Sequence, residues 1–117
     1  MFMNNLSLAY LGDAVYELYV RKFLISKNIT KVNDLQTESL KYVTAPSQRK
    51  ILENLLNNNV LNEDEKEIVR KGRNTASRRS KTTDVVTYHL STGFECLIGY
   101  LYLNNPKRLE EIMEIIL

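Results

Sequence analysis

The stretch Leu11-Gly12-Asp13-Ala14-Val15-Tyr16-Glu17-Leu18 decides how this chain is interpreted, because it places an acid directly after a glycine inside an apolar run. Burying an ionised carboxylate costs roughly several kcal/mol unless a partner or a metal ion neutralises it. Folding alone therefore gives little reason for Asp13. The apolar residues around it cover most of a helix, which predicts a central, buried helix that carries a functional acid.

A second segment of the same kind, Gly93-Phe94-Glu95-Cys96-Leu97-Ile98-Gly99-Tyr100-Leu101, lies far along the chain. We expect the two apolar helices to cross at the centre of the domain, where Gly12 and Gly99 would permit close approach. Carboxylate oxygens of Asp13 and Glu95 that face each other there are the ligands that Mg²⁺ prefers, with water completing its octahedron. Such an ion would activate water and stabilise the charge that builds on a phosphodiester.

An alternative remains open for both acids, which could instead pair with buried Arg or Lys side chains or form hydrogen bonds within their helices. Glu17 lies four residues after Asp13 and shares its helix face. We interpret Glu17 as a solvated group or as one that contacts a metal-binding side chain without binding the metal itself.

Length and composition favour a single globular domain over residues 1–117, with 44% apolar residues. The only cysteine, Cys96, excludes an internal disulfide and a cysteine zinc cluster, fits a reducing cytoplasm, and is interpreted as buried apolar filling. No apolar run reaches the roughly 18–20 residues that span a bilayer, and no leader pattern begins the chain. We therefore expect a cytoplasmic protein with no membrane partner.

The fold class predicted from these patterns is all-α. The chain has four glycines and two prolines, and no strand-like alternation persists. Pro46 suits a first helical turn, Asn62 and Glu65 form a capping-box pattern, Gly72 suits a helix end, and Thr82 or Thr83 is expected to cap the long helix that follows. The expected helices are 5–26, 33–42, 46–57, 62–71 and 83–103, and a final helix that follows Asn104-Asn105-Pro106 and runs to residue 117.

Positive charge is concentrated between Arg70 and Lys81, where six basic residues occur without an acid. Such a segment predicts a local contact with a polyanion, and guanidinium, hydroxyl and amide groups are the donors that grip phosphate and sugar oxygens. The segment has no aromatic residue, which favours a duplex backbone over stacked single strands. A solvated loop is the alternative, and His89 is interpreted as a structural or RNA-facing group. The candidate RNA-binding residues are Lys71, Arg73, Asn74, Arg78, Arg79 and Lys81.

The two acidic segments resemble the signature motifs of the ribonuclease III family. Residues 11–15 resemble the signature helix of its catalytic domain, and residues 94–99 resemble its second acidic motif: glutamate, a small residue, leucine, isoleucine and glycine. Further blocks at 8–14, 71–74, 83–85 and 88–95 extend the similarity, in order, over nearly the whole chain. They resemble the short bacterial form, which has no double-stranded-RNA-binding domain.

This resemblance implies a homodimeric, Mg²⁺-dependent endoribonuclease that acts on double-stranded RNA. In it Asp13 and Glu95 would be the catalytic, metal-binding acids. The expected substrate is a base-paired stem of the precursor of 23S ribosomal RNA, whose ends would be matured. A large-subunit ribosomal protein on that precursor is a candidate partner. In the broader family each subunit cuts one strand and leaves 5′-phosphates with short 3′ overhangs.

The match departs from full-length ribonuclease III at three carboxylate positions, which hold Leu6, Ala9 and Thr92 here. The resemblance therefore favours one largely water-coordinated ion, or ions completed by RNA phosphates, over a full two-metal cage. The missing acids also motivate an alternative function, a catalytically silent RNA-binding module of ribosome assembly. A helical interaction protein without an RNA role explains neither the embedded acids nor the basic segment.

A dimer has separate support in the apolar residues that extend along the first helix. They cover more surface than one small domain easily buries, and large apolar patches usually mark interfaces. The same residues would equally serve a simple core. They are Tyr16, Tyr19, Phe23 and Leu24.

Overall fold

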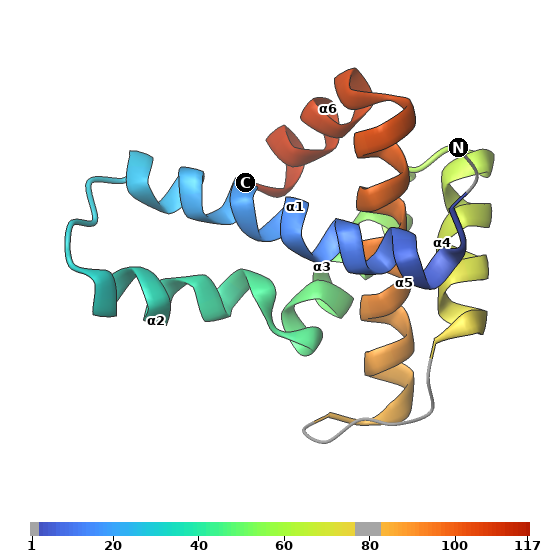
Figure 1. The fold of residues 1–117 in the computed structure, drawn as a ribbon, viewed down its shortest axis with the longest axis horizontal. Helices are drawn as coiled ribbons and strands as arrows, with labels where there is room; N and C mark the ends of the chain where they lie inside the picture. The colour runs from blue at the N-terminus through green and yellow to red at the C-terminus, as the bar shows by residue number, and fades with distance from the viewer. Residues whose placement is uncertain (1–2, 77–82) are drawn as a thin grey trace.

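The fold is an assembly of α-helices around one long central helix, as shown by a computed structural model that describes residues 3–76 and 83–117 (Figure 1). No strand occurs among those residues, so the prediction of an all-α fold is confirmed. The helices are α1 (Asn5–Ser26), α2 (Val32–Val43), α3 (Ala45–Asn57), α4 (Glu63–Thr75), α5 (Val85–Asn104) and α6 (Pro106–Ile116).

Helices α1 and α5 cross at the centre of the molecule, as expected from their apolar sequences (Figure 1). Glycine from each helix makes this crossing possible. A Cβ atom added at Gly12 would lie 1.7 Å from the carbonyl oxygen of Glu95, and one added at Gly99 would lie 2.0 Å from that of Leu8. The Tyr16 and Phe94 rings meet edge to face beside the crossing, with centroids 5.0 Å apart. The two acidic segments are therefore fixed backbone against backbone.

Helix α4 packs against another side of α5 through a second pair of glycines. A Cβ at Gly72 would lie 2.7 Å from the Cys96 Cβ, and a Cβ at Gly93 would lie 2.7 Å from the Val69 carbonyl oxygen. The prediction that Gly72 ends its helix is wrong, because α4 continues through it to Thr75. Gly72 serves close packing between helices.

Side-chain caps define most of the remaining boundaries. The predicted capping box of Asn62 and Glu65 is confirmed at the start of α4. Thr44 both ends α2 and caps α3, so these helices join without a loop, and Pro46 lies in the first turn of α3. Asp84, rather than the expected Thr82 or Thr83, caps α5 through the Thr87 amide. Helix α2 begins at Val32 without a side-chain cap.

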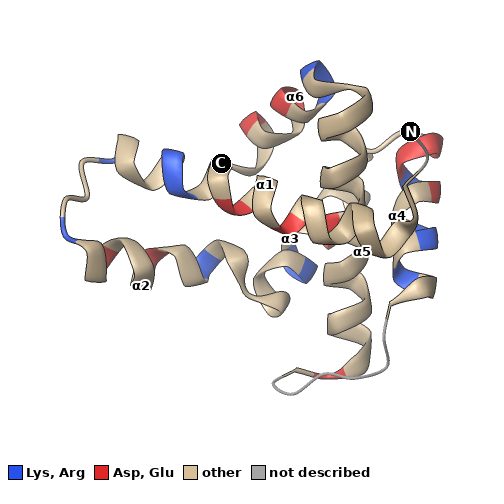
Figure 2. Cartoon of the chain, in the orientation of Figure 1, with Lys and Arg blue, Asp and Glu red and all other residues tan. Residues whose placement is uncertain are grey.

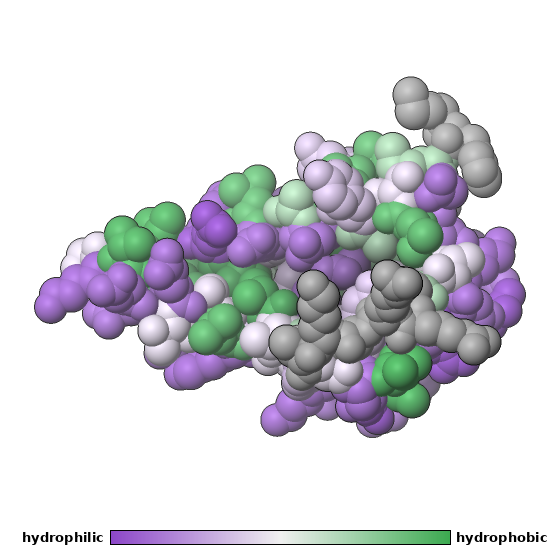
Figure 3. All heavy atoms as spheres, turned by 60° about the horizontal axis from the view of Figure 1, so that its bottom comes forward, coloured by the Kyte–Doolittle hydropathy of each residue, from purple (hydrophilic) through white to green (hydrophobic). Residues whose placement is uncertain are grey.

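The second half of α1 and all of α2 form an arm beside the central crossing (Figure 1). Tyr16 and Leu24 are buried within the single chain, and Tyr19 and Phe23 are half-buried, so these four residues belong largely to the core and offer little to an interface. Other apolar side chains lie exposed among polar ones, on a face partly seen in Figure 3. On this arm they are Leu18, Ile25, Val32 and Leu40. Among the described residues no helix is long and apolar enough to cross a membrane.

Candidate active site

The side chains of Asp13 and Glu95 meet where α1 crosses α5. Their backbones are brought together by Gly12, which packs directly on the Glu95 carbonyl group. Asp13 is exposed and Glu95 is partly buried, and the two carboxyl groups lie within hydrogen-bonding reach of each other. The arrangement has a solvent-facing acid from α1 and a more deeply set acid from α5.

Glu95 is held in an environment that disfavours its charge. Its pKa is raised to about 8, first by burial and then by the negative charge of Asp13 and the hydrogen bond between the two groups. Within residues 3–76 and 83–117 neither acid forms an ion pair with a Lys or Arg side chain. Among the described residues, Asp13 and Glu95 therefore do not pair with buried basic side chains, which was the alternative interpretation of the two acids. Such a pair needs a shared proton or a bound cation to relieve its repulsion.

The donor set suits a divalent cation but is small. Across the described part of the chain, no cluster of three or more His, Cys, Asp or Glu side chains could enclose a metal ion. Leu6 is exposed, Ala9 is buried, and the Thr92 hydroxyl donates to the Tyr88 carbonyl at 3.0 Å. Two carboxylates fit a cation that takes its remaining ligands from water and phosphate oxygens.

A third residue at the site, Gln48 of α3, was missed by the sequence analysis. It is 2% exposed, its side-chain amide donates to the Val43 carbonyl at 3.4 Å, and it lies close enough to the Glu95 carboxyl group to lower the pKa of that group. The only available signal was a glutamine near the start of an amphipathic helix, which is usually a solvated residue.

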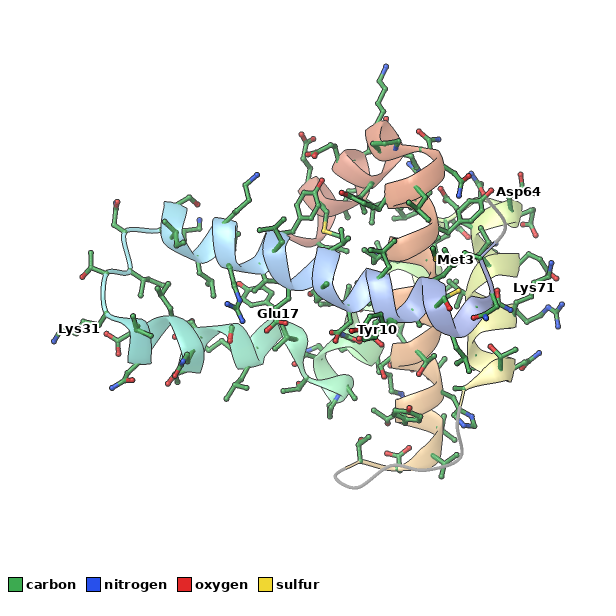
Figure 4. The ribbon with its side chains drawn as sticks, in the orientation of Figure 1. Met3, Tyr10, Glu17, Lys31, Asp64 and Lys71 are labelled. Atoms are coloured by element: carbon green, nitrogen blue, oxygen red, sulfur yellow. The ribbon has the colours of Figure 1, made fainter. Side chains whose placement is uncertain are left out.

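The face of α1 that carries Asp13 continues on either side of it. Tyr10 and Glu17 are labelled in Figure 4 and lie one turn before and one turn after Asp13. Glu17 pairs with the exposed Arg21 at 3.1 Å, so it is a surface group, in line with its interpretation as a solvated acid. Tyr10 is 85% exposed.

Three of the six predicted RNA-binding residues are described by the structure, and all three lie in the last turns of α4. Helix α4 is acidic at its first turn and basic toward its other end (Figure 2). Lys71, Arg73 and Asn74 are all exposed there. The Arg73 amide nitrogen would lie 3.5 Å from a Cβ at Gly93, so the basic end of α4 packs against the part of α5 that lies one turn or less from Glu95 in the sequence. Arg73 and Asn74 also line a surface pocket with His89.

The other predicted RNA-binding residues, Arg78, Arg79 and Lys81, lie outside the described residues. Of the neighbouring cations, Arg70 is engaged locally, because its Nε donates to Glu67 at 2.9 Å. Lys71 and Arg73 form no ion pair with the part of the chain that the structure describes. Their charge is therefore directed to solvent.

The helical fold, the paired acids and the basic end of α4 are compatible with a nuclease domain, and comparison with known proteins identifies the family. The model of the Ribonuclease III domain matches residues 6–106, so the chain belongs to the ribonuclease III family. The protein is an endoribonuclease of this family, as the resemblance implied.

Among its relatives the chain is similar to the short members that bear the name Mini-ribonuclease 3, which confirms the more specific resemblance. It is 47% identical to that of Streptococcus pneumoniae, over 95% of this chain and 88% of the relative. It is 43% identical to that of Enterococcus faecalis, over 95% and 86% respectively. A crystal structure of a protein from Fusobacterium nucleatum is 28% identical, with a TM-score of 0.86, over 97% of this chain and 93% of that one.

Proposed function

We propose that this ribonuclease cleaves double-stranded RNA with a divalent metal ion, Mg²⁺, held by Asp13 and Glu95. The observation that carries the proposal is the contact between these two carboxyl groups without a basic partner among the described residues. A fold maintained only for stability would have no use for two acids in contact at its central helix crossing. A site that binds a cation requires such a pair.

Asp13 and Glu95 would have different roles in holding the metal ion. When bound, Mg²⁺ would activate water and stabilise the negative charge that builds on the scissile phosphodiester. Asp13 is exposed and would hold the ion from the side that faces RNA, whereas Glu95 would hold it from the protein side. Glu95 must release the proton that its raised pKa favours before its carboxylate can bind a cation. The close backbone packing at Gly12 keeps both acids in position.

The basic end of α4 would bind the RNA backbone beside this site. Lys71, Arg73 and Asn74 are exposed donors, and Arg78, Arg79 and Lys81 extend the same run of sequence. Contacts of this kind are made with phosphate and sugar oxygens, so we expect affinity that is modest, depends little on sequence and falls steeply with salt.

The expected biological role is maturation of the ends of 23S ribosomal RNA by a homodimer in the cytoplasm. This role is supported by the similarity to the Mini-ribonuclease 3 proteins and by the family's action on duplexes. Two-fold symmetry suits a duplex with antiparallel strands, because each subunit would face one strand in the same way. A large-subunit ribosomal protein on the precursor remains a candidate partner.

Cleavage of a labelled stem from the 23S precursor tests the catalytic assignment. The variant Asp13→Asn should lose cutting while it keeps its oligomeric state and its binding to the stem, and EDTA should stop the wild-type reaction. Asp34→Asn, which alters an exposed acid of α2, is the matched control and should cut normally. Cutting by Asp13→Asn at the wild-type rate would show that the site is elsewhere. Wild-type protein that bound the stem but left it intact in Mg²⁺ would instead favour the RNA-binding module.

The substrate assignment has a separate test. The ends of 23S precursor RNA can be mapped in cells that lack the protein and in cells that carry Asp13→Asn. Both should accumulate the same extended ends. Normal ends in both strains would remove this RNA as the substrate without affecting the proposed chemistry.

A further inference from the structure

Gln48 is one of the few polar side chains buried in the described part of the chain, and it lies directly behind the acid pair. It occupies the first turns of α3 and is 2% exposed. A primary amide has two N–H donors. Here the side-chain amide donates to the Val43 carbonyl oxygen at the end of α2 and lies beside the Glu95 carboxyl group on α5, whose pKa it lowers. One side chain thus connects three helices at the site.

The local structure fixes the position of this amide. The Thr44 hydroxyl caps α3 by accepting a hydrogen bond from the backbone N–H of Ser47 at 3.3 Å, and the backbone N–H of Gln48 donates to the Thr44 carbonyl at 2.9 Å. The next residue, Arg49, donates to the Thr87 hydroxyl on α5 at 2.9 Å. The start of α3 is therefore pinned to α5, and the Gln48 side chain has little freedom to move away from Glu95.

The chemistry of an amide differs in one respect from that of a cation. An arginine or lysine in this place would orient the Glu95 carboxylate but would also neutralise it, and the site would then compete poorly for a metal ion. A neutral donor orients the carboxylate and leaves its charge available. Gln48 supplies such a donor from a buried, fixed position.

We propose that Gln48 is a positioning residue, which holds the Glu95 carboxylate beside Asp13 in the orientation that binds the metal ion. The inference rests on the proposed function of the acid pair. Groups that orient metal ligands contribute roughly 10–100-fold to metal affinity or activity. We therefore expect loss of the donor to act on the metal and on the rate of cleavage, and to spare binding of RNA.

The test replaces the amide by an apolar side chain of similar length, Gln48→Met, with Gln36→Met on the exposed face of α2 as the matched control. Mn²⁺ binding to each protein alone is measured by electron paramagnetic resonance. Gln48→Met should bind Mn²⁺ about 10-fold more weakly. In steady-state cleavage its kcat should fall and its KM for the RNA should stay unchanged, and added Mg²⁺ should restore part of the rate. Gln36→Met should match the wild type in all of these measurements.

A purely structural role predicts a different result. If the only role of Gln48 is its hydrogen bond to the Val43 carbonyl at the end of α2, Gln48→Met will lower the melting temperature, but its folded molecules will bind Mn²⁺ with the affinity of the wild type. That result would overturn the inference. Should that variant fail to fold, the wild-type fold still provides a test. The side-chain amide resonances of Gln48 should shift in Glu95→Ala, which removes the acceptor on α5. Unchanged resonances would overturn the inference.

These results are separable from failure of the proposed function. If Asp13→Asn and Glu95→Gln both cut RNA normally, the acid pair is not the site and the role of Gln48 fails with it. If both are inactive while Gln48→Met cuts and binds Mn²⁺ normally, only the inference about Gln48 is wrong.

Discussion

Two glutamates on the helices of this molecule, Glu65 and Glu95, lie in opposite electrostatic surroundings. Glu65 begins α4, accepts from the Asn62 amide, and forms a two-point ion pair with Arg108 of α6 at 2.8 and 3.0 Å. Although burial alone would raise its pKa, the hydrogen bonds from Arg108 and Asn62 lower it. Glu95 faces another carboxyl group and a neutral amide, and its pKa is raised.

The difference separates a structural acid from a functional one. Arg108 also donates to the Val60 carbonyl at 2.7 Å, so its guanidinium group joins α6 to the segment before α4 and leaves Glu65 fully partnered. Glu95 has no equivalent cation among the described residues. The fold gives Glu65 a cationic partner but gives Glu95 none among the described residues, and this leaves Glu95 able to bind a metal ion once it has lost its proton.

The largest expected effect comes from neutralising each glutamate in turn. Glu95→Gln should reduce cleavage by about 1,000-fold, because a metal ion contributes several kcal/mol to stabilising the transition state. It should not lower the melting temperature, since it relieves repulsion with Asp13. Glu65→Gln should show the reverse pattern, with normal cleavage per folded molecule and lower stability. Cleavage assays and thermal melts of both variants check the contrast, which would break if both lost activity equally.

Removal of the cation from the structural pair should have the next largest effect. Arg108→Met should lower the free energy of unfolding by about 3 kcal/mol, because it leaves Glu65 buried without a partner. Denaturant unfolding measures this, with Lys107→Met on the exposed neighbour as control. The double variant with Glu65→Met should recover much of the loss. Additive losses in the double variant would show that the two residues do not act as a pair.

A smaller effect is expected from separating the helices at the functional pair. Gly12→Ala should lower the free energy of unfolding by about 2 kcal/mol, because the new methyl group would overlap the Glu95 carbonyl, 1.7 Å away. Mn²⁺ affinity should fall as well, since the shift moves Asp13 away from Glu95. Ser7→Ala, on the exposed side of α1, provides the control. Stability and metal affinity equal to the wild type would mean that the crossing is looser than the structure indicates.

The smallest effect expected is a pH dependence of opposite sign for the two glutamates. Because the folded state raises the pKa of Glu95 from 4.5 to about 8, its contribution to stability is present below pH 4.5 and is lost as the pH rises through 8. The lowered pKa of Glu65 makes its contribution present above 4.5 and lost in more acid solution. In EDTA, the melting temperature of the wild type should fall relative to that of Glu95→Gln as the pH rises from 5 to 8. Parallel curves would contradict the raised pKa.

The sequence was sufficient to predict the helical fold and the meeting of the two acidic segments, because glycine beside an acid in an apolar helix has few other uses. It failed where one residue type serves two purposes. Gly72 is a residue type that often ends a helix, but here it lies within α4 and allows close contact with Cys96. Tyr16 and Leu24 could not be assigned to core or interface, since that depends on which helices cover them.

Gln48 shows the limit for the site itself. Nothing in its local sequence distinguishes it from a solvated glutamine, and its role follows only from the direct junction of α2 and α3 at Thr44 and from contact with α5. Partners that come from three separate helices cannot be read from spacing along the chain. Acids within apolar stretches of sequence can be recognised, because a charged residue in an apolar run is itself the signal.

The central claim is that Asp13 and Glu95 bind a divalent cation together, and anomalous diffraction from crystals soaked in Mn²⁺ tests it most directly. The account predicts an anomalous peak between the two carboxyl groups in the wild type and its loss in Glu95→Gln. A pair that remained empty at saturating Mn²⁺, or that was occupied by the side chain of a Lys or Arg, would contradict it.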